Sequence, residues 1–358
     1  MAGGSGLDHA AGKVEEGAPF PRRFKDIAAV ARSLRKVLVT TRLFDDAAAH
    51  VLASEGFEVV PSGLPADALD TDIADATLDR LLAGASGWIV GQRAVTRAML
   101  ERHPGLIVIA RRGVGYDRVD TAAARELGRV VTIAAGANDA AVADHTLALM
   151  LAVLRRLREG QMRLAAGDWR VVSGSDLFGK TVGLVGFGRI ARQVARRLHG
   201  FDTRVLVATP RPDFSQSGIT YVTLPELLAV SDVVSLHAPL TPATRHLMNA
   251  ETLASLKPGA VVVNTSRGGL IDEAALLAAL EAGRLGGVGL DVFEAEADPA
   301  LTPLADALIA RPDVVASAHA AGSSREALAR GNLISAHCVV AALAGAEIPE
   351  GCLVVDGR

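Results

Sequence analysis

The sequence is poor in several kinds of residue. Only two of its 358 residues are cysteine, Cys338 and Cys352, which excludes a disulfide framework and favours a reducing compartment, so we expect a cytoplasmic location. Aromatic residues make up 4% of the chain, so its cores must be built mainly from aliphatic side chains. The formal net charge of -3 gives no indication of nucleic acid or an anionic membrane surface as a partner. No uninterrupted apolar run approaches the roughly 20 residues of a membrane-spanning helix.

The organisation of the chain changes at Lys36. Residues 1–35 are rich in Gly, Ala and charge and show no periodicity, which predicts a flexible N-terminal extension. Beyond them, short apolar runs alternate with helical patterns, which is typical of parallel α/β sheets. Strands are expected at 36–40, 57–61, 87–91, 106–110, 130–133, 182–185, 203–208, 233–237, 260–264, 287–293 and 314–316. Residues 140–165 predict one long helix that joins two domains, and 324–344 predict another that returns to the first domain.

A glycine turn lies between an expected strand and an expected helix. Gly186 and Gly188 remove side chains where a backbone must lie against a pyrophosphate, and Ala191 takes the third, small position of the dinucleotide fingerprint. The helix that follows offers free N–H groups and the positive end of its dipole to the phosphates. Arg189 and Ile190, in its first turn, are therefore expected cofactor contacts with the two glycines. The alternative is an ordinary strand–turn–helix unit.

The end of the next strand bears on the choice of cofactor. An NAD-binding unit carries an acidic residue there for the ribose hydroxyls, but this chain has Thr209 followed by Pro210 and Arg211. A carboxylate would repel a 2′-phosphate, whereas a hydroxyl and a guanidinium would accept it. We therefore expect NAD(P) binding with NADP(H) favoured over NAD(H). The alternative is that Arg211 is a solvated loop residue.

Four later strands end in polar residues. They deliver His237, Arg267, Asp291 with Glu296, and His319 to the carboxyl edge of one sheet, where the fingerprint turn also lies. Taken singly, each has a simpler interpretation as an ion-paired, solvated or structural residue. Their convergence beside a dinucleotide turn favours a functional site.

These residue types suit hydride transfer between a nicotinamide and a 2-hydroxy or 2-keto acid. Arg267 can hold the acid and polarise its carbonyl, because a guanidinium is permanently charged and binds carboxylate in a fork. His319 can donate or accept the proton, because its pKa lies near working pH. Glu296 can hold the imidazole protonated through a hydrogen bond. Glu294 competes with Glu296 for this last role.

A second loop could contact the substrate. Residues 111–117 (Arg-Arg-Gly-Val-Gly-Tyr-Asp) follow an expected strand directly, and their glycines could bring backbone N–H groups to a carboxylate. Arg111, Val114 and Gly115 are the expected contacts. A glycine turn without a binding role is the alternative.

Several stretches resemble the D-isomer-specific 2-hydroxyacid dehydrogenases. They are 138–145, 186–191 (Gly-Phe-Gly-Arg-Ile-Ala), 231–241 (Ser-Asp-Val-Val-Ser-Leu-His-Ala-Pro-Leu-Thr), 264–268 (Asn-Thr-Ser-Arg-Gly), 290–296 (Leu-Asp-Val-Phe-Glu-Ala-Glu) and 319–322 (His-Ala-Ala-Gly). The resemblance implies an Arg–Glu–His catalytic set, which falls on Arg267, Glu296 and His319, with Arg267 and His319 also binding substrate. The remaining expected cofactor contacts are His237, Pro239, Thr244, Thr265, Asp291 and Gly322. No metal is expected.

The resemblance also implies an architecture. A Rossmann cofactor domain (140–323) is inserted into a flavodoxin-like substrate domain (36–139 and 324–358), both with doubly wound parallel sheets. An interdomain cleft and a homodimer formed largely through the cofactor domain are further expectations.

The chain departs from the family pattern at three positions. Thr209 stands where most members carry Asp, which puts NAD preference in doubt. Ala297 follows Glu296, and Ala318 precedes His319, where proline is usual, so looser loops are expected there.

Two functions are therefore considered. The first is an NAD(P)-dependent oxidoreductase of a small 2-hydroxy or 2-keto acid of the glyoxylate, hydroxypyruvate or phosphoglycerate type. The alternative is an NAD(P)(H)-sensing binding protein, like the family's corepressors.

Overall fold

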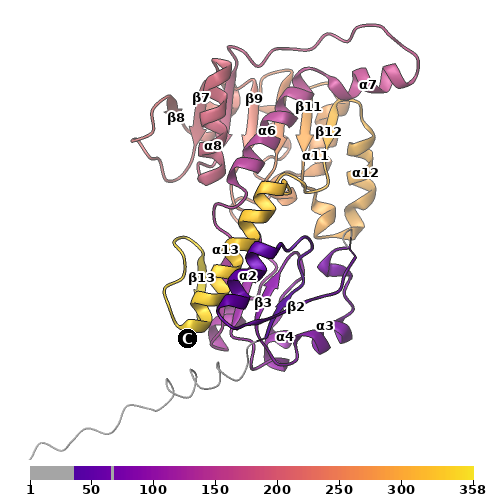
Figure 1. Cartoon of the computed structure of the whole chain (residues 1–358). Helices are drawn as coiled ribbons and strands as arrows, with labels where there is room; N and C mark the ends of the chain where they lie inside the picture. The colour runs from indigo at the N-terminus through magenta and orange to yellow at the C-terminus, as the bar shows by residue number, and fades with distance from the viewer. Residues whose placement is uncertain (1–35, 66–67) are drawn as a thin grey trace, which may run out of the picture.

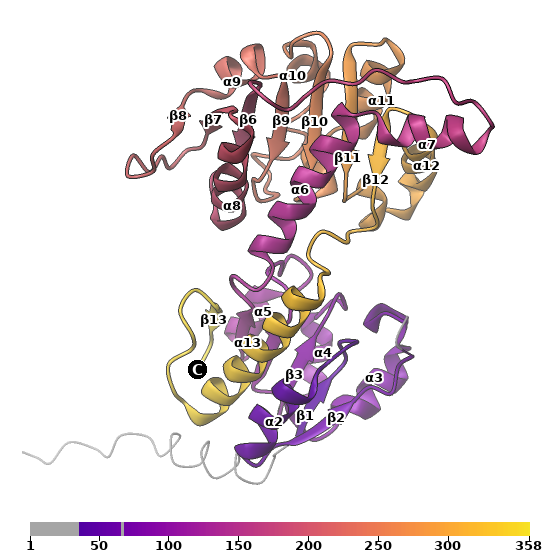
Figure 2. The same ribbon diagram turned by 45° about the horizontal axis from the view of Figure 1, so that its top comes forward.

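Two separate sheets organise the chain (Figures 1 and 2). The structure, a computed structural model, describes residues 36–65 and 68–358, so the predicted flexible extension at 1–35 lies outside the described residues. The strands of the first sheet come from residues 36–133 and 353–356, and those of the second from 181–316. Two α/β domains with largely parallel sheets confirm the expected fold class. The boundaries at 139/140 and 323/324 stay a prediction.

The first sheet has six strands in the order β13-β5-β4-β3-β1-β2. Its strands are β1 (Lys36–Val39), β2 (Glu58–Pro61), β3 (Ala85–Val90), β4 (Val108–Arg111), β5 (Val130–Ile133) and β13 (Leu353–Asp356). Its helices are α2 (Asp46–Ser54), α3 (Asp75–Leu82), α4 (Arg97–Arg102), α5 (Thr121–Glu126) and α13 (Arg325–Ala344), with a 3₁₀ turn η1 (Asp70–Asp72). All neighbouring pairs are parallel except β13 with β5, which is antiparallel.

The second sheet has seven parallel strands in the order β12-β11-β10-β9-β6-β7-β8. Its strands are β6 (Thr181–Val185), β7 (Arg204–Ala208), β8 (Ile219–Tyr221), β9 (Val233–Leu236), β10 (Ala260–Asn264), β11 (Leu285–Leu290) and β12 (Val314–Ala316). Its helices are α6 (Asp139–Leu154), α7 (Leu157–Ala165), α8 (Arg189–Leu198), α9 (Leu224–Val230), α10 (Ala250–Ala254), α11 (Glu273–Glu281) and α12 (Thr302–Ala310). Its 3₁₀ turns are η2 (His199–Phe201), η3 (Gly268–Leu270), η4 (Glu294–Glu296) and η5 (Pro299–Leu301). The strand order reverses between β6 and β9, and ligands of such sheets bind beyond the carboxyl ends of the strands at this point.

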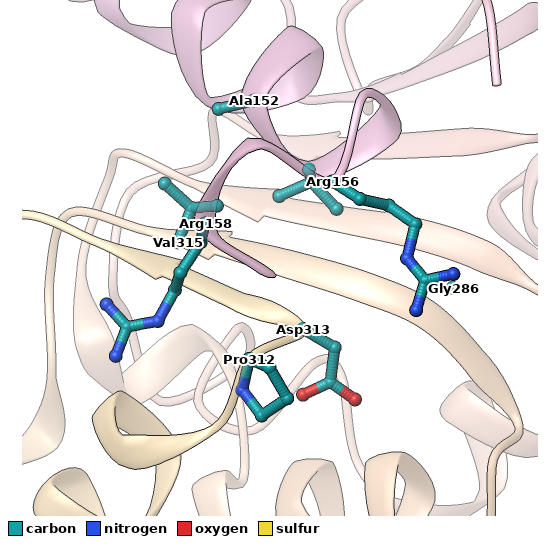
Figure 3. A pocket seen from close by; sticks show the side chains of 8 residues that line it. Ala152, Arg156, Arg158, Gly286, Pro312, Asp313 and Val315 are labelled. Carbon is teal, nitrogen blue, oxygen red and sulfur yellow. The ribbon is translucent and has the colours of Figure 1, made fainter. Parts of the chain in front are cut away.

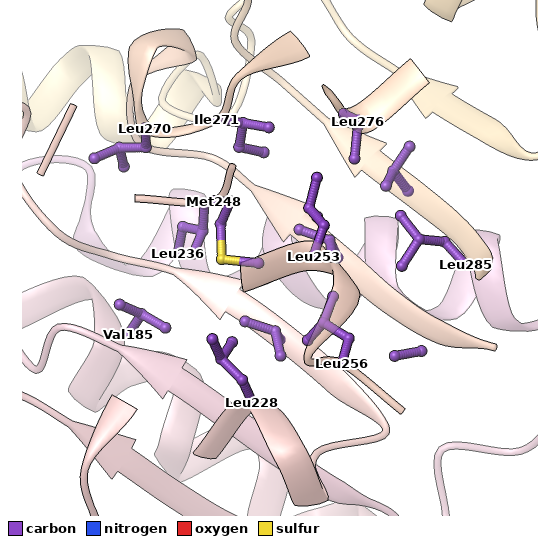
Figure 4. Close-up of a cluster of buried hydrophobic side chains, with 14 of the residues drawn as sticks. Val185, Leu228, Leu236, Met248, Leu253, Leu256, Leu270, Ile271, Leu276 and Leu285 are labelled. Atoms are coloured by element: carbon purple, nitrogen blue, oxygen red, sulfur yellow. The ribbon is translucent and has the colours of Figure 1, made fainter. Parts of the chain in front are cut away.

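Aliphatic side chains fill the second domain, as the low aromatic content requires. Figure 4 shows one of its buried clusters, in which Val185, Leu236 and Met248 lie among leucines from α9, α10 and α11. All five residues of β10 are buried, because the sheet is covered on both faces. Burial on both faces fixes the position of each strand along its own axis, and therefore the place where the following loop leaves the sheet.

The two domains are joined by α6 and by the segment that leads into α13 (Figure 2). Helix α6 packs against β10, β11 and α8 of the second domain. Helix α13 crosses the first sheet, where it contacts β3, β4 and α2. By length and composition alone α13 could cross a membrane, but the core helix of a globular domain passes the same test, and buried side chains of α13 face this sheet.

The prediction of a single helix over 140–165 was wrong. The helix breaks at Arg156, which takes a left-handed conformation (φ 50°), and α7 then starts in a new direction. Arg158 secures the break, because its guanidinium donates to the carbonyl oxygens of Arg311 (3.0 Å) and Ile309 (2.6 Å). A cavity of about 10 Å³ beside the break is lined by Arg156, Arg158 and Asp313 (Figure 3). Its volume suits about one water molecule and no larger ligand.

Several elements were not predicted. The sequence patterns did not predict the short strand β8, the helices α9 to α12 or the antiparallel strand β13. Side-chain caps begin three of the four missed helices: Thr223 caps α9, Asn249 caps α10 and Asp272 caps α11. These caps were the available local signal.

Candidate active site

The turn from β6 to α8 is shaped for close approach of a ligand. Gly186 has φ 90°, and a Cβ there would lie 2.6 Å from the carbonyl oxygen of His237, so only glycine fits. Gly188 faces open space and precedes α8, whose first turn receives no side-chain cap. Arg189 opens the helix and donates to Asp139 of α6 at 2.9 Å, while Ile190 packs on the core. The uncapped N–H groups and the open space fit a bound pyrophosphate.

The loop after β7 carries no acidic residue at its start. The hydroxyl oxygen of Thr209 accepts the backbone N–H of Arg211 at 3.3 Å, and the Arg211 side chain is exposed. The first acidic side chain in the loop, Asp213, accepts from Arg192 of α8 at 2.7 Å and from Ser215 at 2.6 Å. The Asp213 carboxylate is therefore engaged within the loop and with α8.

The loops after β9 and β10 carry the next four predicted cofactor contacts. The His237 ring lies 2.9 Å from the Ser235 hydroxyl, and desolvation lowers the pKa of His237 to about 4, so the ring is neutral. Thr244 donates to the carbonyl of Pro239 at 2.6 Å, which closes a turn. The hydroxyl groups of Thr265 and Thr146 share a buried hydrogen bond of 2.9 Å. These contacts shape the loops, and the assignment of the four residues to the cofactor stays a prediction.

Asp291 holds the loop that presents His319. Its side chain is 0% exposed and accepts hydrogen bonds from the Ser317 hydroxyl (2.6 Å) and from the N–H groups of Ala320 (2.7 Å) and Ala321 (2.9 Å). The Asp291 carbonyl also accepts the N–H of His319 at 2.7 Å. His319 is left-handed (φ 50°), a conformation that these bonds over-determine. Within this loop, Gly322 lies against Asn138 at the start of α6.

Glu296 and His319 form a hydrogen-bonded pair. Nδ1 of His319 lies 2.6 Å from Oε2 of Glu296, and Oε1 of Glu296 accepts the backbone N–H of Phe293 at 3.0 Å. The Glu296 hydrogen bond raises the pKa of His319 above 6.5, despite opposition from burial and from the charge of Arg267. Burial would raise the pKa of Glu296, but the His319 hydrogen bond and charge outweigh it and hold that pKa below its usual range. Glu296, and not Glu294, is thus the partner of the imidazole.

Arg267 lies where the two domains meet. It forms an ion pair with Asp117 of the first domain, in which Nη2 of Arg267 and Oδ1 of Asp117 are 3.0 Å apart. Nη1 of Arg267 donates to the carbonyl oxygen of Ser266 at 2.7 Å. A second contact crosses the same boundary, because Nη2 of Arg118 donates to the carbonyl oxygen of Glu296 at 2.9 Å. Arg267 and Glu296 therefore both contact the loop that follows β4.

The predicted substrate loop is next to Arg267. A Cβ on Gly115 would collide with the Arg267 guanidinium, so a larger residue there would force the Arg267 side chain to move. Arg111 is 8% exposed and lies beneath the loop, where its Nε donates to the carbonyl oxygen of Gly115 at 3.0 Å. Desolvation lowers the pKa of Arg111 to about 10. Val114 is partly exposed at the loop surface. The structure thus brings Gly115, Arg267, Glu296 and His319 into one region, and gives Arg111 a supporting position.

Four residues of the site were missed from the sequence. Asp117 and Arg118 contact Arg267 and Glu296, and His145 and Ser317 contact the Asp291 carboxylate. Asp117 and Arg267 are 150 positions apart, so no local pattern could pair them.

Two cavities in the described part of the chain lie away from this region. The first is the small one beside Arg156, and the second, of about 430 Å³, lies between α8 and residues 215–219. Among residues 36–65 and 68–358, no group of three or more His, Cys, Asp or Glu side chains is placed to hold a metal ion. The cleft expected between the domains stays a prediction.

Comparison with known proteins gives consistent matches. Residues 147–321 match the family described as D-isomer specific 2-hydroxyacid dehydrogenase, NAD binding domain. A hydroxypyruvate reductase of Thermotoga maritima is 39% identical over 238 residues, which cover 66% of this chain and 77% of that protein. A D-3-phosphoglycerate dehydrogenase of Methanocaldococcus jannaschii is 36% identical over 321 residues, which cover 88% of this chain and 58% of that protein. The crystal structure of D-lactate dehydrogenase from Aquifex aeolicus, complexed with NAD and lactic acid, is similar with a TM-score of 0.75 at 28% identity, over 89% of this chain and 99% of that chain.

These relatives are named as enzymes that act on hydroxy or keto acids. They do not favour the alternative of a nucleotide-sensing binding protein. The chain spans little more than half of the phosphoglycerate dehydrogenase that it matches.

Proposed function

This chain belongs to the D-isomer specific 2-hydroxyacid dehydrogenase family, and from that premise we propose that it interconverts a small 2-keto acid and the D-2-hydroxy acid at the Arg267–Glu296–His319 site. The observation that carries the proposal is the Glu296–His319 hydrogen bond of 2.6 Å with the charge of Arg267 nearby. Glyoxylate, hydroxypyruvate and phosphoglycerate-type acids are the substrates that we propose to test.

The residues of the second domain fit a nicotinamide cofactor. Gly186 allows the tight turn and Gly188 faces open space that a pyrophosphate could occupy, and the carboxyl ends of β6 and β9 flank the point where the strand order reverses. When bound, the nicotinamide supplies or accepts the hydride.

The side chains of this chain divide the remaining work. Arg267 binds the substrate carboxylate and polarises the carbonyl, so it exchanges Asp117 for the substrate. Glu296 occupies Nδ1 of His319, which leaves Nε2 to donate a proton to the developing alkoxide. In the oxidation direction, neutral His319 takes that proton back.

A panel of 2-keto acids tests the proposed function. We expect glyoxylate, hydroxypyruvate or 3-phosphohydroxypyruvate to oxidise NADPH or NADH, followed by absorbance at the nicotinamide band, and chiral analysis to give the D product where the product is chiral. Absence of turnover with every acid and both cofactors would refute the proposal.

We also propose that NADPH is preferred over NADH. The start of the loop after β7 carries the uncharged Thr209 and the exposed, cationic Arg211 and no carboxylate that would repel a 2′-phosphate, and Asp213 is engaged by Arg192. Thr209→Asp should shift the kcat/KM ratio towards NADH by about tenfold, because a carboxylate there repels the phosphate and accepts the ribose hydroxyls. Thr220→Asp, at an exposed position on strand β8, is the matched control. An unchanged ratio in Thr209→Asp would remove Thr209 from the cofactor site.

A homodimer formed through the second domain is a further part of the proposal. Helix α7 has no buried residue, and large apolar side chains are exposed on it and on the segment beyond, including Trp169 (82%) and Val171 (90%). A second copy of this chain would cover them.

Light scattering should therefore give twice the 37.0 kDa chain mass. Trp169→Glu combined with Val171→Glu should give monomers, whereas Phe214→Glu, on the exposed loop after β7, should not. A monomeric wild type would contradict the dimer.

A cytoplasmic location stays a proposal, which the two free cysteines support.

A further inference from the structure

One short segment links Arg267 to the first residue of α11. It runs from Arg267 through η3 to Asp272 and Glu273. The segment passes beside η4, the turn that carries Glu296. Two of its residues, Gly268 and Glu273, contact the same peptide group, the one that joins Phe293 to Glu294.

Gly268 approaches that peptide group from one side. A Cβ on Gly268 would collide with the carbonyl carbon of Phe293 and the nitrogen of Glu294. Any other residue at 268 would therefore push the start of η4 away. The backbone following Arg267 and the backbone leading to Glu296 are in direct contact.

Glu273 binds the peptide group by a hydrogen bond. Its side chain is 2% exposed, and Oε1 accepts the backbone N–H of Glu294 at 2.7 Å. Oε2 is buried without a hydrogen-bond partner. A buried carboxylate with one unpartnered oxygen lowers the stability of the folded protein, so a functional reason for its presence is to be expected.

The surroundings of Glu273 are charged. The Glu294 carboxylate accepts from Arg245 at 3.1 Å and lies 2.9 Å from Nε2 of His246. Burial raises the pKa of Glu273 to about 7, helped by the charges of Glu294 and Glu296 and opposed by the Glu294 N–H hydrogen bond and by His246.

Support of the helix does not account for this placement. Asp272 already caps α11, because its Oδ1 accepts the N–H groups of Ala274 and Ala275, both at 3.1 Å. The Glu273 carboxylate turns instead to a different element. Asp272 and Glu273 are adjacent in the chain and therefore provide a matched pair of test positions.

We propose that Glu273 is a positioning residue for the reaction: by holding the N–H of Glu294, with Gly268 against the same peptide group, it fixes η4 and thereby the contact between Glu296 and His319. The inference rests on the proposed function for its catalytic consequence. Its structural part does not rest on the proposed function. The turn η4 is a single 3₁₀ turn, and the Glu296 side chain that it carries is held by the backbone N–H of Phe293 and by His319.

The test compares Glu273→Leu, Glu273→Gln and Asp272→Ala, each as the full chain. The titration of His319 is followed by NMR of histidine-labelled protein, with its signal assigned from His319→Gln, alongside the melting temperature, kcat and KM. In Glu273→Leu we expect the His319 pKa to fall back towards 6.5, because Glu296 is no longer held against the ring. We expect kcat to fall about tenfold, the effect of one lost buried hydrogen bond, with KM changed less than about twofold.

Glu273→Gln should keep most of both properties, because an amide oxygen can accept the same N–H. Asp272→Ala should lower the melting temperature and leave the His319 titration in place. An unmoved His319 titration in Glu273→Leu, or an equal shift in Asp272→Ala, would overturn the proposal. If Glu273→Leu does not fold, Gly268→Ala displaces the same peptide group and must lower the His319 pKa, or the proposal fails.

The titration also separates this inference from the proposed function. If no acid is turned over but the His319 titration moves in Glu273→Leu, the function fails and the positioning role stands. If turnover is present and neither the titration nor kcat responds to Glu273→Leu, the function stands and the positioning role fails.

Discussion

The His319→Gln variant should reduce the best 2-keto acid about a thousandfold more slowly than the wild type, because an amide does not donate a proton at the rate of an imidazolium. Cofactor affinity, measured by fluorescence titration, should remain, since the fingerprint turn at Gly186 lies on a different strand. His337→Gln, at an exposed position on α13, is the matched control. Turnover of His319→Gln at the wild-type rate would show that another group handles the proton.

The pH profile checks the same role independently. Glu296 raises the pKa of His319, and the reduction needs the protonated ring, so kcat/KM should be constant below that raised pKa and fall as pH rises through it. Glu296→Gln removes the carboxylate and should move the fall to lower pH, towards 6.5. A profile that Glu296→Gln leaves in place would separate Glu296 from the imidazole.

Loss of Arg267 should have the second large effect. Arg267→Leu removes the proposed bidentate partner of the substrate carboxylate and the charge proposed to polarise the carbonyl, and kcat/KM should fall about a thousandfold. Arg267→Lys should recover only part of this, because an ammonium keeps the charge without the fork. Arg204→Leu, exposed at the start of β7, is the control.

Asp117 would compete with the substrate for Arg267 in the proposed mechanism. In the structure its carboxylate is paired with Arg267, so a substrate carboxylate that binds Arg267 as proposed must displace it. Asp117→Asn should therefore lower KM for the keto acid while Arg267→Leu raises it. Parallel effects of the two substitutions would indicate that Asp117 acts through Arg267 as a support and not as a competitor.

The sequence was sufficient where local pattern and topology determine the outcome. Strands β5, β10 and β12 were predicted with the bounds observed, since each is a short branched apolar run between turn residues. The positions of His237, Arg267, Asp291 and His319 followed from the rule that parallel strands share a carboxyl edge.

The sequence was insufficient where tertiary contacts decide. The helix breaks at Arg156 with no Gly or Pro at the break itself, and Arg158 gains carbonyl partners on α12 and on the residue after it. The sequence around Glu273 indicates only a good start for a helix. Its contact with Glu294 joins residues 21 positions apart. Contacts of this kind depend on how whole elements pack, which periodicity does not encode.

The loop that carries His319 obtains its rigidity from Asp291. A proline at 318 would restrict the chain before and after folding alike, whereas the hydrogen bonds to Asp291 exist only in the folded protein. The unfolded chain therefore keeps its full conformational entropy at Ala318, and ordering of the loop is coupled to folding of the second sheet. Loss of the hydrogen bonds to Asp291 would accordingly release the loop that presents the imidazole.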